Sequence, residues 1–125
     1  ITSCKKDNGT TALIDFRDTI TGTYKTSSYS WARYPTPPGY FDSTYYHNDI
    51  VYITVEKLNT DSTSLVVMSD TLQLSYRDDT SSSFISGCCH YQHVAYFWKD
   101  SLSYLQGTGG SPVSSFGNGW RGKKQ

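Results

Sequence analysis

Alternation of apolar and polar residues runs through most of the chain and predicts β-strands. The clearest run spans residues 48–58, where Val51, Ile53 and Val55 recur at every second position. Side chains two residues apart point to the same face of a strand, so these three share one face, and Ile50, Tyr52 and Leu58 share the other. The same period marks the other expected strands, which are 18–26, 64–68, 71–76, 88–98, 101–105 and one within 112–125.

Polar segments separate these strands and predict turns and loops. Ser69-Asp70 and Lys99-Asp100 each lie between two alternating runs, which is typical of a β-hairpin turn. Residues 77–86 are polar, and we expect them to form a loop. Residues 27–47 are rich in aromatic residues and proline. Because proline has no backbone N–H to donate, this segment predicts a long connection and not a central strand.

Composition supports an all-β domain. The chain has 18 Ser and 15 Thr but only one Glu and three Ala, so it is poor in helix formers. No apolar run approaches the roughly 20 residues that a transmembrane helix needs. About seven strands joined by mostly short turns predict an antiparallel meander, which hides its edges by closing into a small barrel. A β-sandwich is the alternative.

Seven aromatic residues crowd into positions 29–46 and form the strongest candidate binding feature. Aromatic rings stack on sugars and line apolar pockets, and tyrosine adds a polar group. The alternative is that these rings fold back and cap one end of the barrel as part of its core. The candidate ligand-binding residues are Tyr29, Trp31, Tyr34, Tyr40 and Phe41.

The densest cluster of potential metal ligands is Cys88-Cys89-His90-Tyr91-Gln92-His93. Thiolates and imidazoles at short spacing are typical of zinc or copper sites. On one strand, Cys88 and His90 would share one face, whereas Cys89 and His93 on the other face would lie about 13 Å apart, too far to bind the same ion. Cys88 and His90 could supply two ligands, and His47 or an aspartate would have to supply a third. We therefore expect no metal and no cofactor. Cys88 and Cys89 could form a strained vicinal disulfide, pair between chains or stay free.

Charge and motifs narrow the classes of function. Eleven Lys and Arg balance eleven Asp and Glu, so the net charge is zero and nucleic acid is not an expected partner. Serine is abundant, but the Gly-x-Ser-x-Gly motif of hydrolases is absent and no pair of carboxylates stands out. No catalytic residue is predicted, and a non-enzymatic role is favoured.

The first four residues, Ile1-Thr2-Ser3-Cys4, resemble the lipobox of bacterial lipoproteins, and a polar Lys-Lys-Asp-Asn-Gly segment follows them. This N-terminus, with Tyr-, Ser- and Thr-rich sequence behind it, looks like that of small Bacteroidota lipoproteins. The resemblance implies a lipid on Cys4 and attachment to the outer membrane, facing the periplasm or the cell surface. We expect a lipobox remnant and tether over residues 1–17 and a single β-domain over residues 18–125.

The first expected strand carries Gly22-Thr23-Tyr24 before the aromatic segment and the later hairpins, which is similar to bacterial lipocalin-like domains. Those domains usually show Gly-x-Trp where this chain has Gly-Thr-Tyr. The resemblance implies a lipocalin-like barrel. The resulting hypothesis is a lipid-anchored, non-enzymatic envelope protein that binds a small molecule, a glycan or an envelope protein. The alternative is a hydrolase or metal-dependent enzyme on the same scaffold.

Overall fold

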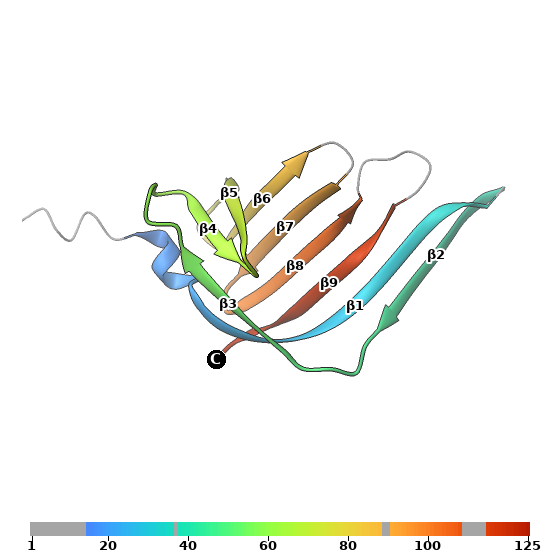
Figure 1. Cartoon of the computed structure of the whole chain (residues 1–125), viewed down its shortest axis with the longest axis horizontal. Coiled ribbons are helices and arrows are strands. Elements are labelled where there is room, and N and C mark those ends of the chain that lie inside the picture. Colours follow the sequence, from blue (N-terminus) through green and yellow to red (C-terminus); the bar gives the residue numbers. More distant parts are fainter. Residues whose placement is uncertain (1–14, 37, 89–90, 109–114) are drawn as a thin grey trace, which may run out of the picture.

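The computed structural model describes residues 15–36, 38–88, 91–108 and 115–125 and shows an antiparallel all-β fold (Figure 1). Residues 1–14, with Cys4 and most of the expected tether, lie outside the described residues. The described chain has one 3-10 turn, η2 (Phe16–Thr19), and within it no helix is long and apolar enough to cross a membrane. The strands are β1 (Gly22–Thr36), β2 (Gly39–Tyr46), β3 (Val51–Lys57), β4 (Ser64–Val67), β5 (Asp70–Arg77), β6 (Ser81–Cys88), β7 (Tyr91–Trp98), β8 (Ser101–Thr108) and β9 (Ser115–Lys124).

Strand β1 closes the sheet into a barrel because both of its edges are paired. Residues 22–26 pair with β3 on one edge, and residues 24–33 pair with β9 on the other. The order β1-β3-β4-β5-β6-β7-β8-β9 then returns to β1, so eight of the described strands form a closed barrel. The predicted antiparallel barrel is thus confirmed, and it is consistent with a lipocalin-like domain.

The aromatic segment 27–47 is largely a strand hairpin, and the prediction of a long connection is wrong. The second half of β1 pairs with β2, which lies beside the barrel wall as an extra strand. Among the described residues, β1 pairs with β9 as far as Arg33, and Pro35 lies beyond it, opposite Tyr40 of β2. Proline is tolerated at a strand position that is paired on one edge. In Figure 1 the hairpin projects past the barrel, away from η2.

Two other sequence predictions differ from the structure. The expected polar loop 77–86 contains most of β6, in which Ser82 and Phe84 are buried. Serine at an inward-facing position hides the apolar alternation, so the pattern did not reveal this strand. The β4–β5 turn lies at Met68-Ser69, with φ of 50° and 71°, one residue before the predicted Ser69-Asp70.

Inward-facing side chains fill the end of the barrel next to η2. Ile53 and Val55 share the buried face of β3, and Ala95 and Phe97 share that of β7, in agreement with the predicted alternation. The ring of Phe97 packs edge-on against Phe84, with centroids 5.8 Å apart. The core consists of Ile20, Tyr24, Ile53, Val55, Leu65, Val67, Leu72, Phe84, Ala95, Phe97, Leu102 and Tyr104.

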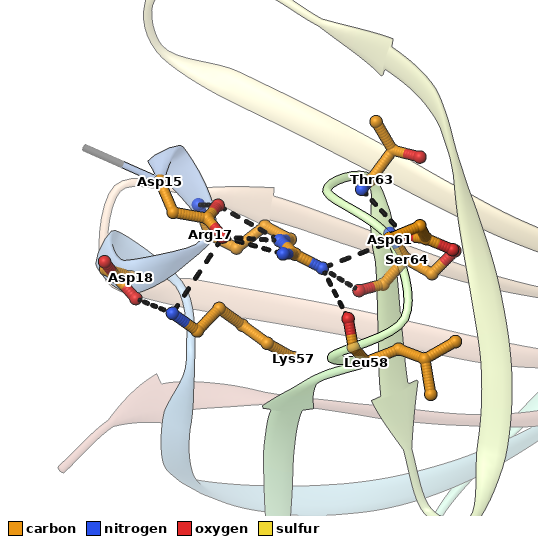
Figure 2. Close-up of polar contacts among 8 residues, drawn as sticks. All are labelled: Asp15, Arg17, Asp18, Lys57, Leu58, Asp61, Thr63 and Ser64. Atoms are coloured by element: carbon orange, nitrogen blue, oxygen red, sulfur yellow. Dashed lines mark hydrogen bonds and ion pairs between the residues drawn. The ribbon is translucent and has the colours of Figure 1, made fainter. Parts of the chain in front are cut away.

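A buried arginine ties η2 to the barrel (Figure 2). Arg17 is 4% exposed, and its Nε and Nη2 atoms donate to the carboxylate of Asp15 at 3.0 and 2.7 Å. Its Nη1 atom donates to the backbone oxygens of Ser64, at 2.6 Å, and Leu58, at 3.2 Å. One guanidinium therefore joins η2 to both sides of the β3–β4 connection. The side-chain hydrogen bond from Arg17 lowers the pKa of Asp15 to about 2.

Further contacts of η2 close this end of the barrel. Lys57 of β3 forms an ion pair with Asp18 at 2.6 Å, and the ring of Phe16 stacks on the buried Phe84 with centroids 6.2 Å apart. The sequence places residues 15–17 in the tether, but in the described chain Asp15, Phe16 and Arg17 take part in the packing at the end of the β-domain.

Replacing Arg17 with methionine should lower the free energy of unfolding by about 3 kcal/mol. The variant keeps the length of the side chain but removes the guanidinium hydrogen bonds to Asp15 and to the backbone oxygens of Ser64 and Leu58. Urea denaturation measures the loss. The control is Arg33→Met, because Arg33 forms an exposed ion pair with Asp42, and this variant should stay within about 0.5 kcal/mol of wild type. Equal losses in the two variants would contradict the role of Arg17.

Candidate functional site

A groove of about 680 Å³ lies on the outer face of the barrel, over β7, β8, β9 and β1. Side chains alternate across each strand, so the outward residues of β7 and β8 are those between the buried ones. The segment that connects β2 to β3 borders the groove on one side. The lining residues are Ser27, Ser28, Tyr29, Tyr46, His47, Asn48, Tyr96, Trp98, Ser101, Leu102, Ser103, Arg121, Gly122 and Lys123.

Strand register places three kinds of side chain in order across this groove. Residues opposite each other in antiparallel strands share a face and lie close together. An aromatic residue of β7 lies opposite a serine of β8, and that serine lies opposite a cation of β9. The two rows are Trp98–Ser101–Lys123 and Tyr96–Ser103–Arg121.

Strand β7 supplies the aromatic wall. Trp98 is 55% exposed and Tyr96 is 50% exposed, while Ala95 and Phe97 on the opposite face are buried. Packing of the inner face therefore forces the two aromatic residues outward. Beside the rings, the small side chains of Ser101 and Ser103 of β8 form the floor of the groove and leave the space next to the rings open. Exposed aromatic surface next to polar groups is typical of a binding site.

Strand β9 supplies the positive charge. The guanidinium of Arg121 lies 4.9 Å from the centre of the Tyr29 ring, and its Nη2 atom donates to the Tyr29 hydroxyl at 3.4 Å. Tyr29 itself lies over Gly119, where an added Cβ would come within 2.3 Å of the ring. Lys123 forms an exposed ion pair with Asp100 at 3.5 Å. Arg121 is thus positioned by neutral aromatic surface, which leaves its charge available.

The β2–β3 connection is fixed to β1 at the rim of the groove. Asp49 accepts hydrogen bonds from the backbone N–H of Ser28, at 2.9 Å, and from its hydroxyl, at 2.5 Å. The hydroxyl bond contributes most to lowering the pKa of Asp49. His47 contacts the hydroxyl of Ser30 at 2.9 Å, and its backbone N–H donates to the Ser28 oxygen at 3.0 Å. Neighbouring Tyr46 is 68% exposed.

The structure separates the five predicted ligand-binding residues. Tyr29 lines the groove, whereas Trp31 is not among its lining residues. Trp31 lies on the same outer face, one row further along β1. Tyr34 and Phe41 lie opposite each other in the hairpin, and Tyr40 lies opposite Pro35. The side chains of Tyr34, Tyr40 and Phe41 lie outside the described part of the structure.

The sequence did not identify most of the groove. Tyr96, Trp98, Arg121 and Lys123 were not candidates, although the alternation in residues 88–98 already placed Tyr96 and Trp98 on one face. The missing information is the pairing of β8 with both β7 and β9, which brings together residues more than 20 positions apart. The Lys99-Asp100 turn predicts the pairing of β7 with β8, but no local pattern encodes the register of β9 against β8.

The cysteine and histidine cluster divides between two strands, so the strand predicted over residues 88–98 is correct from Tyr91 on, as β7, but wrong at Cys88, which belongs to β6. Cys88 ends β6 and Tyr91 begins β7, and the two residues lie opposite each other. Cys89, His90 and the side chain of Cys88 lie outside the described residues. Among the residues described, no group of three or more His, Cys, Asp or Glu side chains is placed to hold a metal ion.

A polar cluster on the inner face of β5, β7 and β8 centres on Asp70. Its Oδ2 atom lies 2.6 Å from Nδ1 of His93 and accepts hydrogen bonds from the Tyr104 hydroxyl, at 2.5 Å, and from Nε2 of Gln106, at 3.3 Å. Burial is the main cause, and the bond to Asp70 the second, of a strongly raised pKa of Tyr104. This tyrosine therefore stays protonated and serves as a donor. The cluster satisfies buried polar groups where the apolar core ends.

Replacing Trp31 with alanine should lower the free energy of unfolding by about 2 kcal/mol, between the cost of a core truncation and that of a surface change. The indole is partly buried against β8 and β9, since an added Cβ at Gly117 would lie 2.7 Å from it. Urea melts of Trp31→Ala and wild type measure the loss. A loss below about 0.5 kcal/mol would show that the ring is not held by these strands.

Comparisons with known proteins give this chain no relative: no protein-family model, no curated protein and no solved structure matches it.

Proposed function

We propose that this chain is a non-enzymatic binding domain of the bacterial cell envelope, with its ligand site on the outside of the barrel. The observation that carries the proposal is the groove over β7, β8, β9 and β1, where exposed aromatic rings, serine hydroxyls and two cations converge. Binding sites combine apolar contact area with a few polar groups that orient the ligand. The end of the barrel next to η2 is filled by core side chains, which favours the outer wall as the site.

The chemistry of the groove favours binding over catalysis. Its described lining residues include no carboxylate, so hydrolysis by a pair of acidic groups has no candidate there. The histidine at the rim, His47, contacts Ser30, and Ser30 donates in turn to Asn118 at 3.1 Å. These contacts hold the rim in place.

The lipobox-like N-terminus supports a location at the membrane. Ten residues separate Cys4 from Asp15, the first described residue of the barrel. A chain of that length spans at most about 40 Å when fully extended. A lipid on Cys4 would therefore keep the domain close to the bilayer while leaving its outer wall accessible to envelope components.

Replacing Cys4 with alanine should release the full-length protein, expressed with a lipoprotein signal, from the membrane fraction. The variant lacks the thiol that would carry the lipid, and the remaining N-terminal lysines bind a membrane only weakly. Detergent partitioning of the wild-type and variant proteins measures the difference, and mass spectrometry of the wild type should find an acylated N-terminal peptide. A variant that stays membrane-bound to the same extent would contradict lipid anchoring.

Replacing Trp98 with alanine should weaken binding to an envelope component by about tenfold or more, because the variant loses the largest exposed ring of the groove. Full-length protein is titrated with separated polysaccharide, lipid and protein pools of the envelope. The matched control is Tyr52→Ala, since Tyr52 is 61% exposed on β3 and does not line the groove. Absence of saturable binding to every pool, or equal effects of the two variants, would contradict the proposed function.

A further inference from the structure

We propose that the outer groove recognises an acidic sugar, that is, a sugar ring that carries a carboxylate or a sulfate group. This inference rests on the proposed function and names the chemical class of the ligand. It follows from the order of side chains across the groove, in which β7 offers aromatic faces, β8 offers hydroxyls and β9 offers cations. A sugar ring with an acidic substituent presents an apolar C–H face, hydroxyls and a negative charge in the same order.

The aromatic wall suits the apolar face of a sugar ring. Trp98 and Tyr96 lie two residues apart on β7, so their side chains stand on the same face about 7 Å apart along the strand. Both remain half exposed, while Ala95 and Phe97 on the other face of β7 are buried. The ammonium group of Lys99 lies 4.9 Å from the Trp98 ring at the end of this wall. A ring stacked here would therefore lie next to positive charge.

The floor offers hydrogen bonds. Ser101 and Ser103 lie between the aromatic wall and the cations, and each hydroxyl can both donate and accept. Within the described chain no side chain or backbone group forms a hydrogen bond with either hydroxyl, so both are available to sugar hydroxyls. Strands β7 and β9 are two strand spacings apart, about 10 Å, which leaves room for one sugar ring above the serines.

The far wall carries the charge that selects an anion. Arg121 is held over the Tyr29 ring and donates to a neutral hydroxyl, so the tyrosine orients the guanidinium without neutralising it. A guanidinium fixed in this way can bind a carboxylate or a sulfate with two parallel hydrogen bonds. Lys123 adds a second positive charge, and Lys25 lies opposite Lys123 on the same outer face. Asp100 partly offsets the charge of Lys123 through an exposed ion pair at 3.5 Å. Within the described chain the Arg121 guanidinium contacts only the neutral Tyr29, so Arg121 is the main anion-binding group.

Other ligand classes match this groove less well. A wholly apolar ligand would bury the Arg121 guanidinium and the serine hydroxyls without hydrogen-bond partners, which is unfavourable. A neutral glycan would use the aromatic wall and the serines but would not use the two cations. An anionic lipid surface would meet the exposed lysines, but it would not need a groove set below Tyr46 and Trp98.

Isothermal titration of the full chain tests this inference with four probes: a galacturonic acid trisaccharide, its methyl ester, a sulfated trisaccharide and phosphatidylglycerol vesicles. We expect saturable binding of at least one acidic sugar, at least about tenfold tighter than binding of the methyl ester, and weakened by added salt. Comparison of the carboxylated and sulfated probes identifies which acidic group is preferred.

Substitutions in the aromatic wall on β7 and in the charged wall on β9 test whether the sugar binds in the groove. Arg121→Gln and Trp98→Ala should each weaken acidic-sugar binding by about tenfold or more. Arg121→Lys keeps the positive charge but loses the two parallel N–H donors of the guanidinium, and its effect should be intermediate. The controls are Arg33→Gln and Tyr52→Ala, both outside the groove, and circular dichroism checks that every variant folds.

Three results would overturn the inference. They are no binding of either acidic sugar, equal affinity for the acid and its methyl ester, and binding of the vesicles alone. Equal binding of acid and ester that still depends on Trp98 would leave the proposed binding function standing and reject only the anionic ligand. Absence of binding to all four probes and to every envelope pool would reject both.

Discussion

The pairing of β1 with β9 is the constraint on which the rest of the structure depends. Without it, both strands would be edges with unpaired backbone groups, and the sheet would remain open. Glycine makes this pairing possible at its closest point, because an added Cβ at Gly122 would lie 1.9 Å from the backbone oxygen of Lys25. At Gly119 the missing side chain leaves room for the Tyr29 ring to cross β9. The closed barrel therefore needs small residues in β9 as much as apolar residues in its core.

Closure also creates the candidate site. It places Arg121 of β9 between Ser103 of β8 and the ring of Tyr29 on β1, although these three residues come from widely separated parts of the chain. The inner side of the same strands carries buried residues such as Phe97 and Leu102. Strand alternation then obliges their neighbours to face outward, and it is these outward side chains that line the groove.

The sequence predicts the fold better than the site. Alternation identifies β3 and β7 and the two-residue connections between strands, since those signals are local. It fails for β6, where Ser82 occupies an inward position, and for the hairpin around Pro35, which lies beyond the last described pair of β1 with β9. It also fails to identify Arg121, whose role depends on register between strands that are distant in the sequence. A site that is built from side chains of several paired strands cannot be recognised from the sequence of a single strand.

The residues that stabilise the fold and the residues that line the groove lie in separate parts of the molecule. The buried Arg17 joins η2 to the backbone of the β3–β4 connection. Arg17 and Asp15, which form this contact, do not line the groove. The groove residues Trp98 and Arg121 lie on the outer surface and contribute little to the apolar core. Substitutions at sites without shared partners have nearly additive effects on stability. The outer wall can therefore change its side chains, and with them the chemistry of the groove, while the barrel beneath it keeps the same packing.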